Sequence, residues 1–136
     1  MDRISWEEVW IGFADLISKR SADPKHKVGA IIVSSDNTQV LSVGYNGDHK
    51  GGPNKRESLE TGRSGFIHAE INALIKCNYH TFGDKVMYVT LSPCIDCAKA
   101  IINADIKTLI YKEEYQDRAG LDLLKEFGVE VRMANT

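Results

Sequence analysis

The chain has 136 residues, of which 43% are hydrophobic and 26% charged, and its formal net charge is -2 at pH 7. This length suits one domain with a real core, and the charge gives no argument for binding nucleic acid or a membrane surface. No apolar run is long enough to span a bilayer. The acidic, amphipathic start MDRISWEEVW does not resemble a signal peptide, and three cysteines are an odd number. We therefore expect a cytosolic (cytoplasmic) protein whose thiols are free or bind metal.

The apolar pattern of the first half predicts a helix followed by a hairpin. Residues 4–20 suit an amphipathic helix with Ser5 as its N-cap. Two β-branched runs, 28–35 and 39–43, flank a short polar turn and predict paired strands. The glycine-rich stretch 44–65 is long for a loop without structure, which is typical of functional or mobile segments.

The second half alternates helix and strand. The predicted helices are 66–78, 93–104 and 117–127, and the predicted strands are 85–91, 107–111 and 128–132. This alternation favours right-handed parallel crossovers. Together with the hairpin, it predicts a three-layer α/β/α fold over residues 1–136, with a mixed five-stranded sheet and helices on both faces.

A pair of cysteines opens the predicted helix 93–104. Ser92 can cap this helix, and Pro93 suits its first position, where the missing N–H costs nothing. Cys94 and Cys97 then share a face near the positive end of the helix dipole, which favours thiolates. By itself the pair fits a redox couple, half of a structural zinc site, part of a catalytic metal centre, or two inert thiols.

A histidine and a glutamate at the start of the preceding helix narrow this choice. His68 can supply a third ligand if strand 85–91 brings the two helix starts to one edge of the sheet. One imidazole and two thiolates leave a fourth zinc position open, which is the layout of a catalytic site. Glu70 is then free to carry protons.

The motifs His68-Ala69-Glu70 and Pro93-Cys94-Ile95-Asp96-Cys97 together resemble the signature of the zinc-dependent nucleoside and nucleotide deaminases. Within that superfamily the chain is similar to the deoxycytidylate (dCMP) deaminases from about residue 4 to its C-terminus. The stretches that carry this likeness are Arg20-Ser21, Asp23-Pro24, VGAIIV at 28–33, GYNG at 44–47 and CAKAII at 97–102. The resemblance implies a cytidine-deaminase-like fold, one catalytic Zn²⁺ and hydrolysis of dCMP to dUMP and ammonia. Glu70 would carry the proton to N3 of the base and then to the leaving amino group.

The resemblance also implies contacts with the substrate. Asn46 would contact the deoxyribose, Tyr115 would lie near the nucleotide, and the backbone of Ala69 and Ser92 would hold the pyrimidine together with Glu70. The 5′-phosphate needs cationic or amide donors, for which the first candidates are Lys25, His26 and Lys27, and the second are Arg20, Arg63 and Arg118. The long loop's cationic side chains predict a solvated face, or else a lid or effector loop: His49, Lys50, Lys55, Arg56 and Arg63.

The implied partners are small molecules and further copies of the chain. Relatives are usually dimers or hexamers, and many respond to dCTP and dTTP. The resemblance therefore implies a homo-oligomer, with Mg²⁺ as a companion of a nucleotide effector. No nucleic-acid or membrane partner is expected.

Three other functions fit some of these residues. A related deaminase acting on cytidine, dCTP, a modified dCMP, guanine or a tRNA adenosine would share the core motif, although a tRNA enzyme should have a basic surface. A zinc-stabilised binding module would have no need of Glu70. A thiol oxidoreductase commonly has its proline between the two cysteines, whereas Pro93 precedes both.

Overall fold

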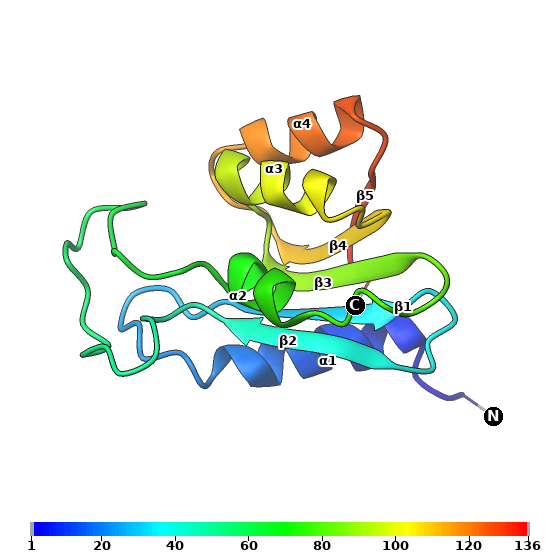
Figure 1. The fold of residues 1–136 in the computed structure, drawn as a ribbon, viewed down its shortest axis with the longest axis horizontal. Helices are drawn as coiled ribbons and strands as arrows, with labels where there is room; N and C mark the ends of the chain where they lie inside the picture. Colours follow the sequence, from blue (N-terminus) through cyan, green and yellow to red (C-terminus); the bar gives the residue numbers. More distant parts are fainter. Residues whose placement is uncertain (1, 136) are drawn as a thin grey trace.

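A computed structural model describes residues 2–135 of the chain as five strands and four helices (Figure 1). In chain order they are α1 (Trp6–Ser18), β1 (Gly29–Ser34), β2 (Val40–Tyr45), α2 (Ala69–Lys76), β3 (Lys85–Leu91), α3 (Ile95–Asn103), β4 (Thr108–Glu113), α4 (Ala119–Glu126) and β5 (Glu130–Met133). Each predicted element is present, most of them one to three residues shorter at their ends. Among these residues no helix is both long and apolar enough to cross a membrane.

The strands form one mixed sheet in the order β2-β1-β3-β4-β5. β1 runs antiparallel to both of its neighbours, whereas β3, β4 and β5 are parallel. These three strands are parallel because α3 and α4 each return the chain to the end of the sheet at which the preceding strand began. The predicted mixed five-stranded sheet is therefore confirmed.

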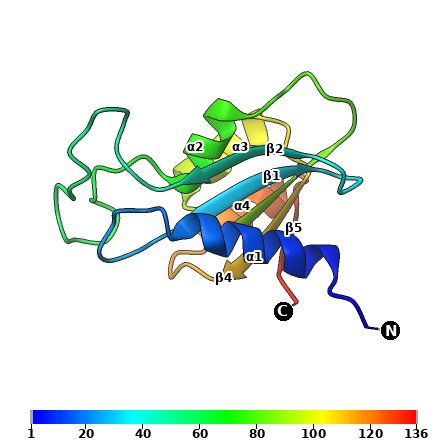
Figure 2. The same cartoon turned by 90° about the horizontal axis from the view of Figure 1, so that it is seen from below.

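Alternate side chains of β1 divide the core into two layers. Ile31 and Val33 pack with Trp10 of α1 on one face, and Ala30 and Ile32 belong to the layer formed with α2, α3 and α4 on the other. Figure 2 shows α1 lying alone across its face of the sheet. Each fully buried aliphatic side chain contributes about 1.5–3 kcal/mol to folding. The sheet is thus a rigid base for the ends of the helices.

Of the two N-caps predicted from the sequence, one is confirmed and the other is wrong. Ser5 caps α1 as predicted, since its Oγ accepts from the Glu8 N–H at 3.1 Å. The prediction that Ser92 caps α3, with Pro93 at its first position, is wrong. The Ser92 N–H donates to the Glu113 carbonyl at 2.9 Å, so strand pairing continues through this residue. The N-cap is Cys94, whose backbone is extended.

Two glycines allow close packing beneath the helix starts. A Cβ on Gly44 of β2 would lie 2.4 Å from the Ala69 carbonyl oxygen, so its absence lets α2 rest directly on the strand. A Cβ on Gly120 of α4 would lie 2.1 Å from the Pro93 carbonyl oxygen. These contacts fix where α2 begins and where the chain turns into α3.

Candidate functional site

A histidine and two thiols meet where α2 and α3 begin. His68 is the N-cap of α2, and Nδ1 of its ring lies 3.2 Å from Sγ of Cys97 and 3.5 Å from Sγ of Cys94. All three donor atoms lie within 4.8 Å of one another. Zinc bonds of about 2.0 Å to nitrogen and 2.3 Å to sulfur at a tetrahedral angle would separate the two donors by about 3.5 Å. The three residues therefore fit a Zn²⁺ ion with a fourth position open.

The three donors of this centre share protons with one another. Hydrogen bonds from Cys97 and then from His68 lower the pKa of Cys94 to about 4. Its thiolate in turn raises the pKa of His68. The hydrogen bond that the Cys97 thiol makes with Cys94, together with burial, raises the pKa of Cys97. A divalent ion would replace these shared protons, because thiolates bind metal only when deprotonated.

Glu70 lies beside this centre, one residue into α2. Its side chain is only 4% exposed, and burial raises its pKa to about 7. It also interacts with the Cys97 thiol. A carboxyl group with a pKa near neutrality can both accept and donate a proton under ordinary conditions.

The centre opens into a cavity of about 500 Å³. It collects most of the residues predicted to bind substrate from five separate segments: Lys25, His26, Asn46, Ala69, Ser92 and Tyr115, together with His68, Glu70 and Cys94. Cys97 lies below the cavity wall and is buried. Lys27 is not in the wall, since its ammonium donates to the Ser21 carbonyl at 2.5 Å and it lines a smaller neighbouring cavity of about 200 Å³.

Backbone groups of the cavity wall offer one donor and one acceptor. Ala69 is the first residue of α2, so its N–H has no partner within the helix. The N–H of Ser92 is already bound to the Glu113 carbonyl, so the group it can present is its own carbonyl oxygen. The Ser92 hydroxyl accepts from the Tyr115 N–H at 2.7 Å and holds the β4–α4 connection against the site.

The side-chain amide of Asn46 is held in one orientation. Its nitrogen donates to Asp23 Oδ2 at 3.2 Å and to the His26 carbonyl at 2.8 Å. Its oxygen accepts from the Val28 N–H at 2.8 Å. Since an amide oxygen has two lone pairs, one acceptor position is left for a ligand in the cavity.

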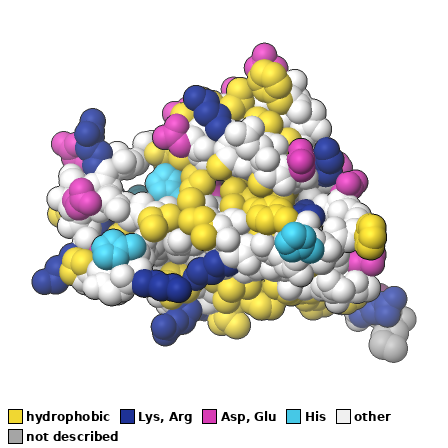
Figure 3. Space-filling view, viewed as in Figure 1, with side chains coloured by type: hydrophobic (Ala, Val, Ile, Leu, Met, Phe, Trp, Pro, Cys, Tyr) yellow, Lys and Arg dark blue, Asp and Glu magenta, His cyan; other side chains and the backbone are white. Residues whose placement is uncertain are grey.

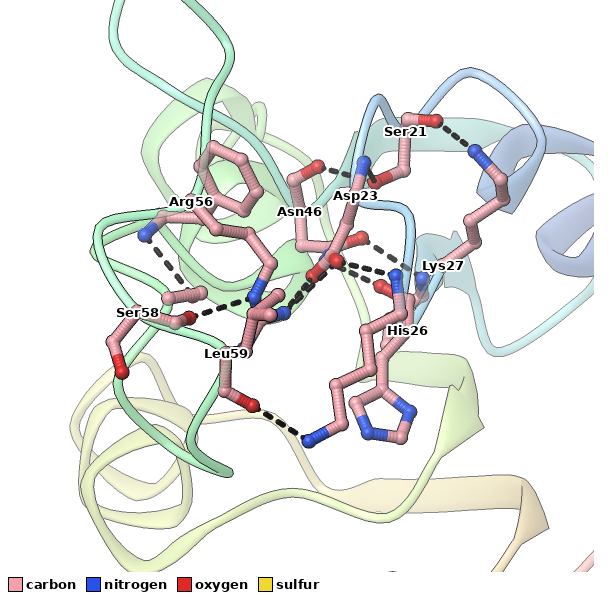
Figure 4. Close-up of polar contacts among 12 residues, drawn as sticks. Ser21, Asp23, His26, Lys27, Asn46, Arg56, Ser58 and Leu59 are labelled. Atoms are coloured by element: carbon pink, nitrogen blue, oxygen red, sulfur yellow. Dashed lines mark hydrogen bonds and ion pairs between the residues drawn. The ribbon is translucent and has the colours of Figure 1, made fainter.

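Arg56 contradicts the prediction of a solvated loop face. Its side chain is only 5% exposed, and its Nη1 lies 2.9 and 2.7 Å from the two carboxylate oxygens of Asp23, which is 2% exposed. Figure 4 shows the guanidinium reaching from the long loop to this carboxylate, with Asn46 beside it. No spacing pattern in the sequence predicts this pair, because 33 positions separate the two residues.

Neighbouring donors stabilise the charged form of Asp23. Burial acts to raise the pKa of this carboxyl, but the Lys25 N–H, the Arg56 guanidinium and the His26 N–H together hold it below its ordinary value. Glu113 and Glu114, where β4 ends, also line the cavity. The cavity wall therefore combines Lys25, His26 and the Asp23–Arg56 ion pair with two carboxyl groups where β4 ends.

Comparison with known proteins places this site in a family. Residues 4–113 match the cytidine and deoxycytidylate deaminase zinc-binding region. The chain is 36% identical to ComE operon protein 2 of Bacillus subtilis, covering 96% of this chain and 72% of that protein. It is 38% identical to human deoxycytidylate deaminase, covering 85% and 70% respectively. The structure of dCMP deaminase from the cyanophage S-TIM5 with dCMP and dUMP superposes with a TM-score of 0.85, at 34% identity, covering 98% of this chain and 99% of that one. The chain thus belongs to the zinc-binding cytidine and deoxycytidylate deaminase family.

Proposed function

We propose that this protein is a zinc-dependent deaminase that hydrolyses dCMP to dUMP and ammonia. The observation that carries the proposal is the buried carboxyl of Glu70 beside the His68, Cys94 and Cys97 donors at the wall of a nucleotide-sized cavity. The similarity to human deoxycytidylate deaminase and to the dCMP-bound cyanophage enzyme supports the choice of substrate.

His68, Cys94 and Cys97 would hold the zinc ion. Zinc in such an open site supplies an activated water at neutral pH, because it lowers the pKa of that water to about 7. Glu70 takes a proton from the attacking water and delivers it to N3 of the cytosine. After the new C4–O bond has formed, Glu70 transfers the second proton of that water to the amino group. The C4–N bond then breaks and ammonia leaves, which balances the hydrolysis.

The remaining groups of the wall would orient the nucleotide. The Ala69 N–H can donate to O2 of the pyrimidine, and the Ser92 carbonyl can accept from its amino group. The free lone pair of Asn46 Oδ1 can accept from the 3′-hydroxyl of the deoxyribose. Tyr115 closes the cavity on the β4–α4 side.

Lys25 and His26 are the proposed partners of the 5′-phosphate. Both line the cavity, whereas Glu113 and Glu114 in the same wall would repel a phosphate. Lys25 donates to the Leu59 carbonyl at 2.7 Å and still has two ammonium hydrogens for a phosphate. Lys27 remains a weaker candidate, because it faces the neighbouring cavity.

Assembly, regulation and location remain expectations drawn from the family. A homo-oligomer agrees with large exposed apolar side chains such as Ile75, Tyr79 and Phe82. Figure 3 shows hydrophobic side chains gathered across the middle of one face, with charges of both signs around them. This mixed charge does not resemble a nucleic-acid surface. Control by dCTP or dTTP with Mg²⁺, and a cytoplasmic location, complete the proposal.

A substrate panel tests the proposal. Purified, zinc-loaded protein is incubated with dCMP, dCTP, deoxycytidine, CMP, guanine and a tRNA substrate, with and without dCTP or dTTP as effector, and ammonia release is followed. The account predicts release from dCMP above all other substrates. No release from dCMP in any condition would remove the substrate assignment, and preferred release from another compound would replace it.

A further inference from the structure

Arg56 joins two parts of the chain that lie 33 positions apart in the sequence. Its Nε donates to the Ser58 carbonyl at 2.9 Å and its Nη2 to the Glu60 carbonyl at 3.3 Å. Its Nη1 binds both oxygens of Asp23. The guanidinium thus holds its own loop folded and ties that loop to the segment between α1 and β1 (Figure 4).

The same carboxylate of Asp23 holds Asn46. Asp23 Oδ2 accepts from Asn46 Nδ2, and the His26 carbonyl accepts from the same nitrogen. If the amide were turned over, its oxygen would face these two acceptors and the Val28 N–H would face an NH₂ group. A charged Asp23 therefore acts together with the His26 carbonyl and the Val28 N–H to exclude the reversed amide.

We propose that Arg56 is a positioning residue, which acts through Asp23 to keep the Asn46 oxygen facing the sugar of the substrate. The inference rests on the proposed function, because it assigns the free lone pair of Asn46 to the 3′-hydroxyl. Arg56 itself need not touch the nucleotide.

Removal of the Arg56 guanidinium would take away the ion pair that keeps Asp23 charged. Asp23 would be left as a buried carboxylate without its cation, and such a group takes up a proton or moves toward water. A protonated Asp23 is a hydrogen-bond donor, so one of the two acceptors that face Asn46 Nδ2 would be lost. The His26 carbonyl and the Val28 N–H alone would then oppose the reversed amide. The Asn46 oxygen would then be held less firmly toward the cavity, where an acceptor is needed.

The loop itself depends on the same side chain. Gly47 and Ile67 close its base through two backbone hydrogen bonds of 3.0 and 2.8 Å. Between these points Lys25 holds the Leu59 carbonyl, and Arg56 holds the neighbouring carbonyls. The loop residues Thr61, Gly62 and Ser64 form part of the cavity wall. Lysine has no planar fork and cannot reach Asp23 and both carbonyls together.

The test compares two substrates that differ only in the proposed contact. The kcat/KM of each variant is measured with dCMP and with 2′,3′-dideoxycytidine 5′-monophosphate, which lacks the 3′-hydroxyl. The variants are Arg56→Met, Arg56→Lys, Asn46→Ala, the double variant of Arg56→Met with Asn46→Ala, and Lys55→Met. Lys55 is the matched control, because it is an exposed cation on the same loop.

The preference of the wild-type protein for dCMP is expected to fall about 10-fold in Arg56→Met, in line with one misaligned hydrogen bond in a buried site. Arg56→Lys should restore part of this preference, and Lys55→Met should keep all of it. The double variant should be no less selective than Asn46→Ala alone, since both changes act on one contact.

Three results would overturn the inference. These are an unchanged preference in Arg56→Met, equal losses with both substrates, and additive losses in the double variant. If Arg56→Met does not fold, Arg56→Lys takes its place in the cycle, and equal losses with both substrates again decide against positioning. Failure of the wild-type protein to deaminate dCMP is a separate result, which removes the proposed function.

Discussion

Nδ1 of His68 lies 3.2 Å from Sγ of Cys97, although the two residues are 29 positions apart in the sequence. The distance is set by the sheet. α2 rests on β2, and α3 follows directly from β3, so both helices begin at the same end of the sheet. The zinc donors therefore lie at the starts of two helices that pack against the buried sheet. This packing fixes their positions, as a preorganised metal centre requires.

The first prediction concerns the metal ligands. Cys94→Ser should lower bound zinc well below one ion per chain, because a serine hydroxyl is a poor replacement for a thiolate. Zinc is measured by elemental analysis after dialysis. Cys77→Ser is the control, since Cys77 lies at the far end of α2. Full zinc content in the Cys94 variant would contradict its assignment as a ligand.

The second prediction concerns proton transfer. Glu70→Gln keeps the shape of the side chain but removes its ability to exchange protons. We expect bound zinc to be retained and kcat to fall by about 10²–10⁴-fold. Steady-state rates of dUMP formation, together with zinc content, check both statements. Near-normal turnover would require another group to carry the proton.

The third prediction is a pH dependence of stability at Asp23. The pKa of this carboxyl is lowered from its ordinary value of 3.8, so its contribution is fully present above pH 3.8 and is lost as the pH falls through the lower, folded-state pKa. At pH 7, Asp23→Asn should cost about 3–5 kcal/mol, because it leaves a buried guanidinium unpaired. The difference from the wild type should begin to shrink as the pH falls below 3.8 and should vanish below the lower, folded-state pKa, where the native carboxyl is also protonated.

Urea unfolding at pH 7, 4 and 3 measures this difference. The control is Glu60→Gln, which breaks an exposed ion pair with Arg63 on the same loop and should change the free energy of unfolding by less than about 1 kcal/mol. A cost at Asp23 that stays constant with pH would show that the carboxylate charge is not its source.

The fourth prediction concerns the packing of α2. Gly44→Ala would place a Cβ 2.4 Å from the Ala69 carbonyl oxygen and 2.5 Å from the Ala73 backbone nitrogen. The helix must shift, which should destabilise the protein by about 1–3 kcal/mol and weaken zinc binding through His68. Gly47→Ala is the control, because the nearest atom there is 4.0 Å away. Equal effects of the two changes on thermal unfolding would contradict this account.

The sequence predicted the fold and the metal centre because both depend on local patterns. The apolar spacing marked each helix and strand, and the His68-Ala69-Glu70 and Pro93–Cys97 motifs placed every zinc donor at a helix start. The start of α3 was misplaced because continued pairing of Ser92 with Glu113 is a tertiary effect. The role of Arg56 was missed for the same reason, since a buried ion pair across 33 positions leaves no periodic trace.

Removal and return of zinc test the central claim most directly. The protein is stripped with a chelator, reloaded with one equivalent of Zn²⁺, and assayed at each stage for conversion of dCMP to dUMP and ammonia. The account predicts that conversion is lost with the metal, returns with it, and does not return in Glu70→Gln, whatever the thiol reductant present. Conversion that persists in the stripped protein, or zinc-reloaded protein that leaves dCMP unchanged, would contradict it.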